Sequence, residues 1–211
     1  MQNVMNNPLG LVFCDSSWEE NFIMDEIQTE YRPDTWNLQP GDTVIEIGGH
    51  TGEVSMTLAK KYGARVFVFE PSPLNYSRLM ANIKTNRLGD LIKVFNFAIT
   101  GDGRDIRMHM TKNSGAHRIY GSKAGPIVKS KTLKDALKMC KFDKPPKVMI
   151  MDCEGAEFEI LKDLEPLKGI EIFRGEFHEA FGGGNIDELL AIVKTIVPSV
   201  SVCMTYAKIV K

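Results

Sequence analysis

The chain has 211 residues, of which 43% are hydrophobic and 25% charged, and its formal net charge is −1. This length and composition suit one globular domain with a sizeable core. The balanced charge gives no general electrostatic reason to bind nucleic acid or an acidic membrane, so we expect neither partner. The sequence shows no signal-peptide pattern, and its four cysteines form no C-x-x-C pair. We therefore expect a cytoplasmic protein with reduced thiols.

The first 40 residues form a predicted N-terminal helical extension. Capping residues at 15–16 and apolar residues at helical spacing predict a helix over 18–31, which Pro33 ends. The turn formed by residues 40–42 then leads into the first predicted core strand.

From residue 43 onward, apolar runs and helical segments alternate. The predicted strands are residues 43–48, 65–70, 92–98, 148–152, 170–178 and 200–206, and the predicted helices are 51–62, 74–86, 156–164 and 185–197. Apolar runs of this kind are typical of parallel strands that are buried on both faces. The alternation predicts a single domain over residues 1–211 with an α/β fold, in which a doubly wound, mostly parallel sheet carries helices on both faces.

The alternation is interrupted over residues 105–131. Two short predicted strands, 105–110 and 126–131, flank a polar loop, and a predicted helix follows over 132–141. Long loops inside compact domains are more often functional than idle. We therefore predict a hairpin or flap insertion on the substrate side.

The most informative segment is residues 46–52, EIGGHTG, which lies between a predicted strand and a predicted helix. Glu70 ends the next predicted strand, 24 residues after Glu46. This separation fits the turn and helix of a nucleotide-binding βαβ unit. Glycines in such a turn let a ligand approach the backbone, and Glu70 can accept hydrogen bonds from a ribose diol.

The same turn argues against a dinucleotide. The G-x-G-x-x-G fingerprint would require glycine where this chain has His50 and Glu53. Glu53 also places a negative charge near a helix N-terminus that a pyrophosphate would need. A nucleoside without phosphates fits better, and we expect S-adenosylmethionine (SAM), whose positive charge Glu46 can favour.

A second acidic cluster ends a later strand, where ligands bind in open α/β sheets. Asp152 and Glu154 can orient a substrate hydroxyl, accept its proton or interact with a sulfonium. Glu157 has a plainer explanation, because it complements the dipole of the following helix. His178, at the end of the next strand, is either a general base or a structural histidine at the rim. No set of His, Cys, Asp and Glu residues has good metal-ligand spacing, so we expect no required metal.

Several segments together resemble the FkbM family of SAM-dependent methyltransferases. They are VIEIGGHTGEVSMTLAKKYG, VFVFEPSPLNYSRLMANIKTN, VFNFAI, VKSKTLKDAL, MDCEGAEFEIL and GEFHE, between residues 44 and 179. The resemblance implies a class I methyltransferase fold, which is Rossmann-like, and methyl transfer to oxygen. It also implies that residues 48–52 and Glu70 hold the methionine and ribose parts of SAM, with Ala98 beside the adenine.

On the acceptor side, the resemblance implies that Asp152 and Glu154 line the reaction centre and that Glu176 and His178 face the acceptor. The chain departs from the family at Ile150, where members commonly have lysine. Its C-terminal part is also short for the usual final antiparallel hairpin. The short C-terminal part implies an acceptor pocket that is reduced or completed by another chain.

These observations predict a SAM-dependent methyltransferase whose acceptor is a small hydroxylated molecule, such as a sugar or polyketide. The alternatives are an N-methyltransferase and a catalytically silent nucleoside-binding module, and the sequence is compatible with a homo-oligomer. The predicted catalytic residues are Asp152, Glu154 and His178. The predicted cofactor-binding residues are Glu46, Gly48, Gly49, His50, Thr51, Gly52, Glu70, Pro71, Ser72, Ala98 and Asp152.

Overall fold

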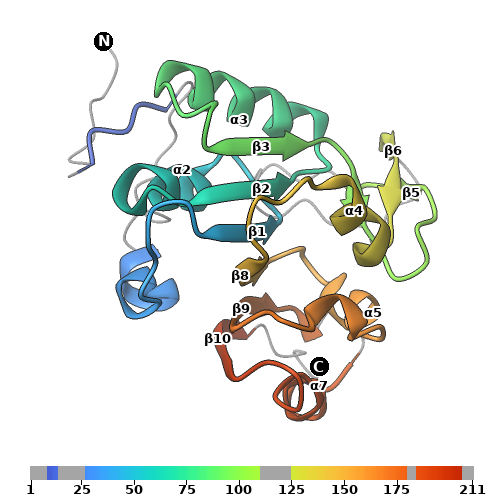
Figure 1. Ribbon diagram of the computed structural model, residues 1–211. Helices are drawn as coiled ribbons and strands as arrows, with labels where there is room; N and C mark the ends of the chain where they lie inside the picture. The colour runs from blue at the N-terminus through green and yellow to red at the C-terminus, as the bar shows by residue number, and fades with distance from the viewer. Residues whose placement is uncertain (1–8, 14–26, 110–124, 180–183, 206–211) are drawn as a thin grey trace.

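A computed structural model describes residues 9–13, 27–109, 125–179 and 184–205 (Figure 1). Most of the predicted helix over 18–31 lies outside these ranges. Its last residues form the π-helical turn η1, Ile27–Tyr31, which the short 3-10 helix η2, Pro33–Thr35, follows. Ile27, Tyr31 and Trp36 are buried, so this segment packs on the domain.

A six-stranded sheet forms the centre of the molecule. Its strands are β1 (Thr43–Ile47), β2 (Arg65–Phe69), β3 (Ile92–Phe95), β8 (Pro146–Met151), β9 (Ile172–Phe177) and β10 (Ser199–Thr205). They lie in the order β10-β9-β8-β1-β2-β3, and every neighbouring pair is parallel. The chain therefore reverses its direction of winding between β1 and β8. In open α/β sheets, such a switch point opens a crevice at the carboxyl ends of the strands.

The strand residues alternate between two hydrophobic cores, as the period of two in a β-strand requires. Val44, Val66 and Val68 belong to one core, which includes residues of α2 (Glu53–Tyr62) and α3 (Pro73–Thr85). Ile45 and Ile47 belong to the other, together with residues of α4 (Leu133–Met139), α5 (Glu157–Ile160) and α7 (Ile186–Val193). The predicted doubly wound α/β fold is confirmed. Two helices are shorter than the sequence predicts. α5 spans four residues where a helix over 156–164 is predicted, and α7 spans eight where a helix over 185–197 is predicted.

The predicted strand over 92–98 is wrong at its end, because the chain leaves the sheet at Asn96. The side-chain amide of Asn96 donates to the carbonyl of Glu70 at 2.8 Å, which fixes the departure point. Beyond it, β4 (Ala98–Ile99) pairs in parallel with β7 (Ser130–Lys131), and β5 (Ile106–Arg107) pairs antiparallel with β6 (Ile127–Val128). The loop predicted over 111–124 lies outside the described residues.

This excursion lies at the edge toward which the arrowheads of β1, β2 and β3 point (Figure 1). Ala98, Ile106, Met108 and Val128 form a small buried core of its own. Within the described ranges, no helix has the length and apolar character that crossing a membrane requires.

Candidate active site

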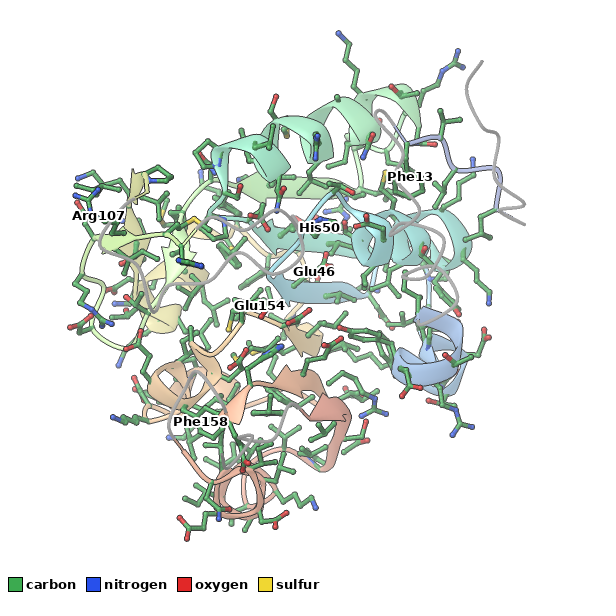
Figure 2. The ribbon with its side chains drawn as sticks, turned by 180° about the vertical axis from the view of Figure 1, so that it is seen from behind. Phe13, Glu46, His50, Arg107, Glu154 and Phe158 are labelled. Carbon is green, nitrogen blue, oxygen red and sulfur yellow. The ribbon has the colours of Figure 1, made fainter. Side chains whose placement is uncertain are left out.

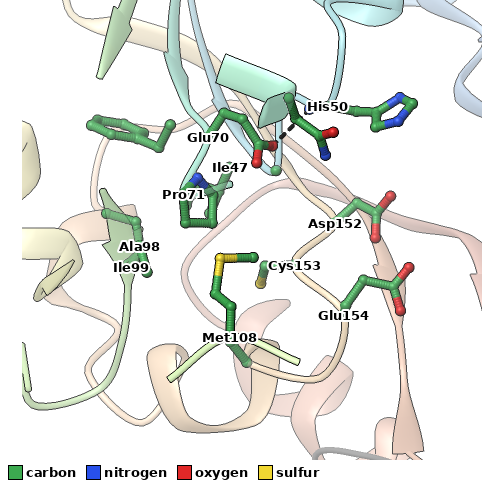
Figure 3. Close-up of a pocket in the computed structure, with 14 residues that line it drawn as sticks. Ile47, His50, Glu70, Pro71, Ala98, Ile99, Met108, Asp152, Cys153 and Glu154 are labelled. Atoms are coloured by element: carbon green, nitrogen blue, oxygen red, sulfur yellow. Dashed lines mark hydrogen bonds between the residues drawn. The ribbon is translucent and has the colours of Figure 1, made fainter. Parts of the chain in front are cut away.

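An open pocket lies at the carboxyl ends of β1, β2 and β8 (Figure 3). It holds about 590 Å³ of space not filled by atoms, part of which is open solvent. One wall is apolar, and the opposite side carries the polar groups of three strand ends. The lining residues are Ile47, Gly48, His50, Phe69, Glu70, Pro71, Asn75, Ala98, Ile99, Met108, Asp152, Cys153, Glu154 and Ala156.

The turn after β1, residues 48–52, is here named the β1 turn, and packing inside the protein explains its glycines. Gly48 has φ +91°, and a Cβ atom there would overlap the carbonyl oxygen of Asp152. A Cβ atom on Gly49 would overlap the side chain of Val68. From the sequence, these glycines are expected to let a ligand approach the backbone. The structure adds a more direct reason, because the backbone carbonyl of Asp152, directly after β8, and the side chain of Val68 in β2 occupy the space.

Glu70 joins the β1 turn to the end of β2. Its Oε2 accepts a hydrogen bond from the backbone N–H of His50 at 2.9 Å, and its Oε1 accepts one from that of Ser72 at 2.7 Å. Since a carboxylate offers about four lone-pair sites, acceptor capacity remains toward the pocket that Glu70 lines. The side chain is buried, and this burial raises the pKa of Glu70 to about 7.

A second pocket adjoins the first and shares Gly48, His50 and Asp152 with it. Its other lining residues are Tyr31, Glu46, Gly49, Glu53, Val54, Ile150 and Glu176. Figure 2 shows Glu46, His50 and Glu154 near the middle of the molecule, from β1, the β1 turn and the segment after β8. The Tyr31 hydroxyl donates to Glu176 Oε1 at 3.2 Å, so the turn η1 helps to wall this pocket.

Two buried glutamates in the second pocket differ in their neighbours. Burial raises the pKa of Glu46 well above its usual range, and the carboxylate of Glu53 raises it further. Glu46 Oε2 is buried without a hydrogen-bond partner among the described residues. Burial alone would raise the pKa of Glu53 too, but the charge and hydrogen bond of His50, 3.2 Å away, bring it below its usual value. Glu46 is therefore a glutamate that a ligand's positive charge would stabilise.

The turn after β8, residues 152–156, is here named the β8 turn, and it is organised by Glu157. This residue is fully buried, and its Oε1 accepts hydrogen bonds from the backbone N–H groups of Cys153 and Gly155 at 3.0 and 3.1 Å. The same oxygen lies 3.2 Å from Nδ1 of His178. The helix-dipole explanation of Glu157 was therefore incomplete, because the side chain points back into the turn.

His178 follows β9 and lies between carboxylates. Its Nε2 is 3.5 Å from Glu154 Oε2, on the side opposite Glu157. Burial by itself lowers the pKa of His178, but the hydrogen bond to Glu157 and the charges of the surrounding glutamates raise it above its usual value overall. These partners stabilise the imidazolium form of the ring, in which both nitrogens donate hydrogen bonds.

The structure brings most of the predicted site residues together. Glu46, Gly48, Gly49, His50, Glu70, Pro71, Ala98, Asp152 and Glu154 line one or both pockets. Four others line neither of these two pockets. Thr51 donates to Glu53, Gly52 precedes α2, and Ser72 caps α3 by accepting from the N–H of Asn75. His178 is joined to the site through Glu154.

Several residues contribute to the site without having been predicted there, among them Tyr31, Asn75, Met108 and Glu157. Met108 comes from the excursion and reaches the pocket wall opposite Glu70, although its neighbours in sequence give no sign of this. Tyr31 lies at the end of the N-terminal extension. A residue that reaches the site from a distant segment leaves no local pattern, whereas Glu157 did have one in the motif D-x-E-G-A-E.

Comparison with known proteins agrees with this architecture. Residues 46–195 match the family model described as the methyltransferase FkbM domain. The methyltransferase sdnD of Sordaria araneosa is 24% identical over 186 residues, covering 72% of each chain. The human tRNA (guanine(37)-N(1))-methyltransferase is 31% identical over 80 residues, which cover 38% of this chain and 15% of that protein.

Solved structures share less with this chain. A precorrin-6y C5,15-methyltransferase from Geobacter metallireducens is 12% identical with a TM-score of 0.38, over 71% of this chain and 56% of that one. A SAM-dependent methyltransferase from Thiobacillus denitrificans, in complex with S-adenosylhomocysteine, is 15% identical with a TM-score of 0.31, over 46% and 36%. This chain thus spans little more than half of these solved chains, or less. The family match extends over more than half of the chain and includes both turns of the site, and the chain belongs to the FkbM family of methyltransferases.

Proposed function

We propose that the protein transfers the methyl group of SAM to a hydroxyl oxygen of a small acceptor. The observation that carries this proposal is Glu70, a buried carboxylate at the end of β2 that lines the pocket beside the β1 turn. Two backbone N–H groups orient it, and lone pairs remain to accept the two hydroxyls of a ribose.

The apolar wall of the first pocket and the second pocket fit the adenine and the amino group of SAM. Pro71, Ala98, Ile99 and Met108 offer an apolar wall on which an adenine ring can pack (Figure 3). The second pocket offers Glu46, whose buried Oε2 has no hydrogen-bond partner in the described part of the chain and suits a positively charged amino group. When bound, this cofactor supplies an electrophilic methyl group on a positively charged sulfur.

The residues shared by the two pockets belong, in this proposal, to the reaction centre. Asp152 would orient the acceptor hydroxyl and accept its proton, and Glu154 would help to hold the acceptor. In-line transfer needs mainly approximation and orientation, which fixed side chains at two strand ends can supply. His178 would act through Glu154, because its ring contacts this carboxylate.

Calorimetry of the purified protein with SAM, S-adenosylhomocysteine and NAD tests the cofactor. We expect binding of the first two and none of NAD, and the opposite result would overturn the proposal. A panel of hydroxylated and amino-bearing small molecules, assayed with labelled SAM, then separates oxygen from nitrogen as the acceptor atom. Cofactor binding without turnover on any oxygen acceptor, together with turnover on an amine, would replace O-methylation by N-methylation.

A further inference from the structure

Three potential metal ligands meet where two neighbouring strands end. Asp152 and Glu154 follow β8, and His178 follows β9, which pairs with β8 in parallel. One ligand atom from each of these side chains lies within 4.8 Å of the other two. Figure 3 shows the side chains of Asp152 and Glu154 extending side by side, away from the wall formed by Ala98 and Ile99.

Glu157 determines which nitrogen of His178 faces the other two carboxylates. Its Oε1 accepts from two backbone N–H groups, so this oxygen is an acceptor and the Nδ1 atom beside it carries the hydrogen. In the neutral ring, Nε2 then directs its lone pair toward Glu154 Oε2 at 3.5 Å. A histidine whose Nδ1–H is held by a carboxylate is the usual arrangement behind a metal-ligating imidazole.

The carboxylates around the His178 ring carry more negative charge than the ring can neutralise, even when it is protonated. Glu157 is fully buried, and its second oxygen, Oε2, has no hydrogen-bond partner among the described residues. Asp152 and Glu154 add two further carboxylates on the opposite side. A single proton on Nε2 can bridge only one pair of atoms, and 3.5 Å is longer than the usual charge-assisted hydrogen bond of about 2.7–2.9 Å.

A divalent cation would contact all three atoms at once. Metal bonds to imidazole nitrogen and carboxylate oxygen are about 2.0–2.2 Å long, so ligand atoms on one metal lie about 3–3.5 Å apart. The three ligand atoms lie within 4.8 Å of one another, and a bound cation would draw them closer. Glu154 is held with φ +55°, an uncommon backbone conformation for a non-glycine residue, in the turn that presents its carboxylate.

We propose that Asp152, Glu154 and His178 form a binding site for a divalent cation, with Glu157 as the residue that positions His178. Two carboxylates and one imidazole suit a cation that accepts both oxygen and nitrogen ligands, such as Mn²⁺. The site is next to the pocket that holds the proposed reaction centre. In a role that rests on the proposed function, the cation would coordinate an oxygen of the acceptor and favour loss of its proton. The sequence alone predicted no required metal, so this inference departs from that expectation.

Titration of the metal-stripped full-length protein with MnCl₂ alone, followed by calorimetry and by the electron paramagnetic resonance of Mn²⁺, tests the site. We expect one Mn²⁺ per chain and an increase in melting temperature on binding. Asp152→Asn and Glu154→Gln should each weaken binding by about ten- to hundredfold, and Glu157→Gln should do so through His178. Glu70→Gln removes a carboxylate from the same pocket outside the three ligands, and it should leave the Mn²⁺ affinity nearly unchanged.

Absence of stoichiometric binding, or equal weakening by Glu70→Gln and the ligand variants, would overturn the inference. Circular dichroism establishes that each variant is folded, and loss of binding in the folded Glu157→Gln protein would support the site even if a ligand variant unfolds. S-adenosylhomocysteine binding, measured in metal-free buffer on the same preparations, reports on the proposed function separately. A protein that binds this nucleoside but no Mn²⁺ would contradict the metal site alone.

Discussion

The β1 turn and the β8 turn are both held by a buried glutamate, but the two glutamates use their oxygens differently. Each turn follows a central strand. Glu70 accepts one backbone N–H from the β1 turn and one from Ser72 after β2, whereas Glu157 accepts two from the β8 turn. Glu70 uses both oxygens, one N–H for each, and keeps acceptor capacity toward the pocket. Glu157 places two N–H groups and a histidine on one oxygen. The first glutamate is therefore suited to bind a ligand, and the second to hold the residues that do.

The largest expected effect comes from the point where the two turns touch. In Gly48→Ala, the new Cβ would overlap the carbonyl of Asp152, and φ +91° is unfavourable for alanine. We expect the free energy of unfolding to fall by about 3 kcal/mol or more, from strain and overpacking together, as measured by denaturant titration.

Two other glycines provide matched controls for this prediction. Gly169 has φ +89° with open space around its Cβ position, so Gly169→Ala should cost only about 1–2 kcal/mol for the backbone strain. Gly89 has neither a positive φ nor atoms close to its Cβ position. Gly89→Ala should change the free energy of unfolding by no more than about 0.5 kcal/mol. Equal effects at Gly48 and Gly169 would show that the two turns do not need their close contact.

The next largest effect tests the β8 turn as the reaction centre. Asp152→Asn is nearly isosteric, so the fold and the cofactor affinity should change little, while turnover should fall by about 100-fold or more if a proton-accepting role is lost. Melting temperature, cofactor affinity and turnover are to be measured on one preparation. Asp90→Asn, an exposed site, is the control.

A different outcome would assign Asp152 to the support of the turn. In that case the melting temperature would fall while turnover per folded molecule survives. Near-normal turnover would remove Asp152 from the proposed catalytic residues and leave His178 as the next candidate.

The sequence predicted the β1 turn far better than the β8 turn. Glycine spacing and the acid at the next strand end are local features, so residues 46–52 and Glu70 could be recognised directly. The α/β alternation likewise predicted the sheet, because strands buried on both faces read as continuous apolar runs. The role of Glu157 depends on His178, 21 residues later. A contact of this kind arises only when β8 and β9 pair, and no local pattern encodes it.

The β1 turn can be tested by removing its glutamate. Glu70→Ala should weaken binding of S-adenosylhomocysteine by about 1.5–3 kcal/mol, the range for hydrogen bonds to a charged group. Calorimetry measures the affinity, and Glu171→Ala at an exposed position controls for the loss of one carboxylate. Unchanged affinity in a folded Glu70→Ala protein would show that this carboxylate serves the turn alone, as Glu157 does.

The smallest effect is a pH dependence that Glu70 should impose on both folding and binding. Its pKa is raised from 4.5 to about 7 by burial. Folding therefore favours the protonated form, and the stability from this group is fully present below pH 4.5 and lost as the pH rises through 7. Between pH 6 and pH 8, the free energy of unfolding of the unliganded protein should fall by about 1.4 kcal/mol from this group.

Binding should depend on pH in the opposite direction, because the ionised carboxylate is the stronger acceptor for ribose hydroxyls. Affinity for S-adenosylhomocysteine should rise by about tenfold between pH 6 and pH 8 if the ionised form alone binds. Glu70→Gln keeps the shape of the side chain and cannot titrate, so it should flatten both profiles. His50 and Glu53, which lie close to Glu70, remain in this variant. Persistence of either slope in Glu70→Gln would assign the pH dependence to His50 or Glu53. The ionisation of Glu70 would then not control ligand binding.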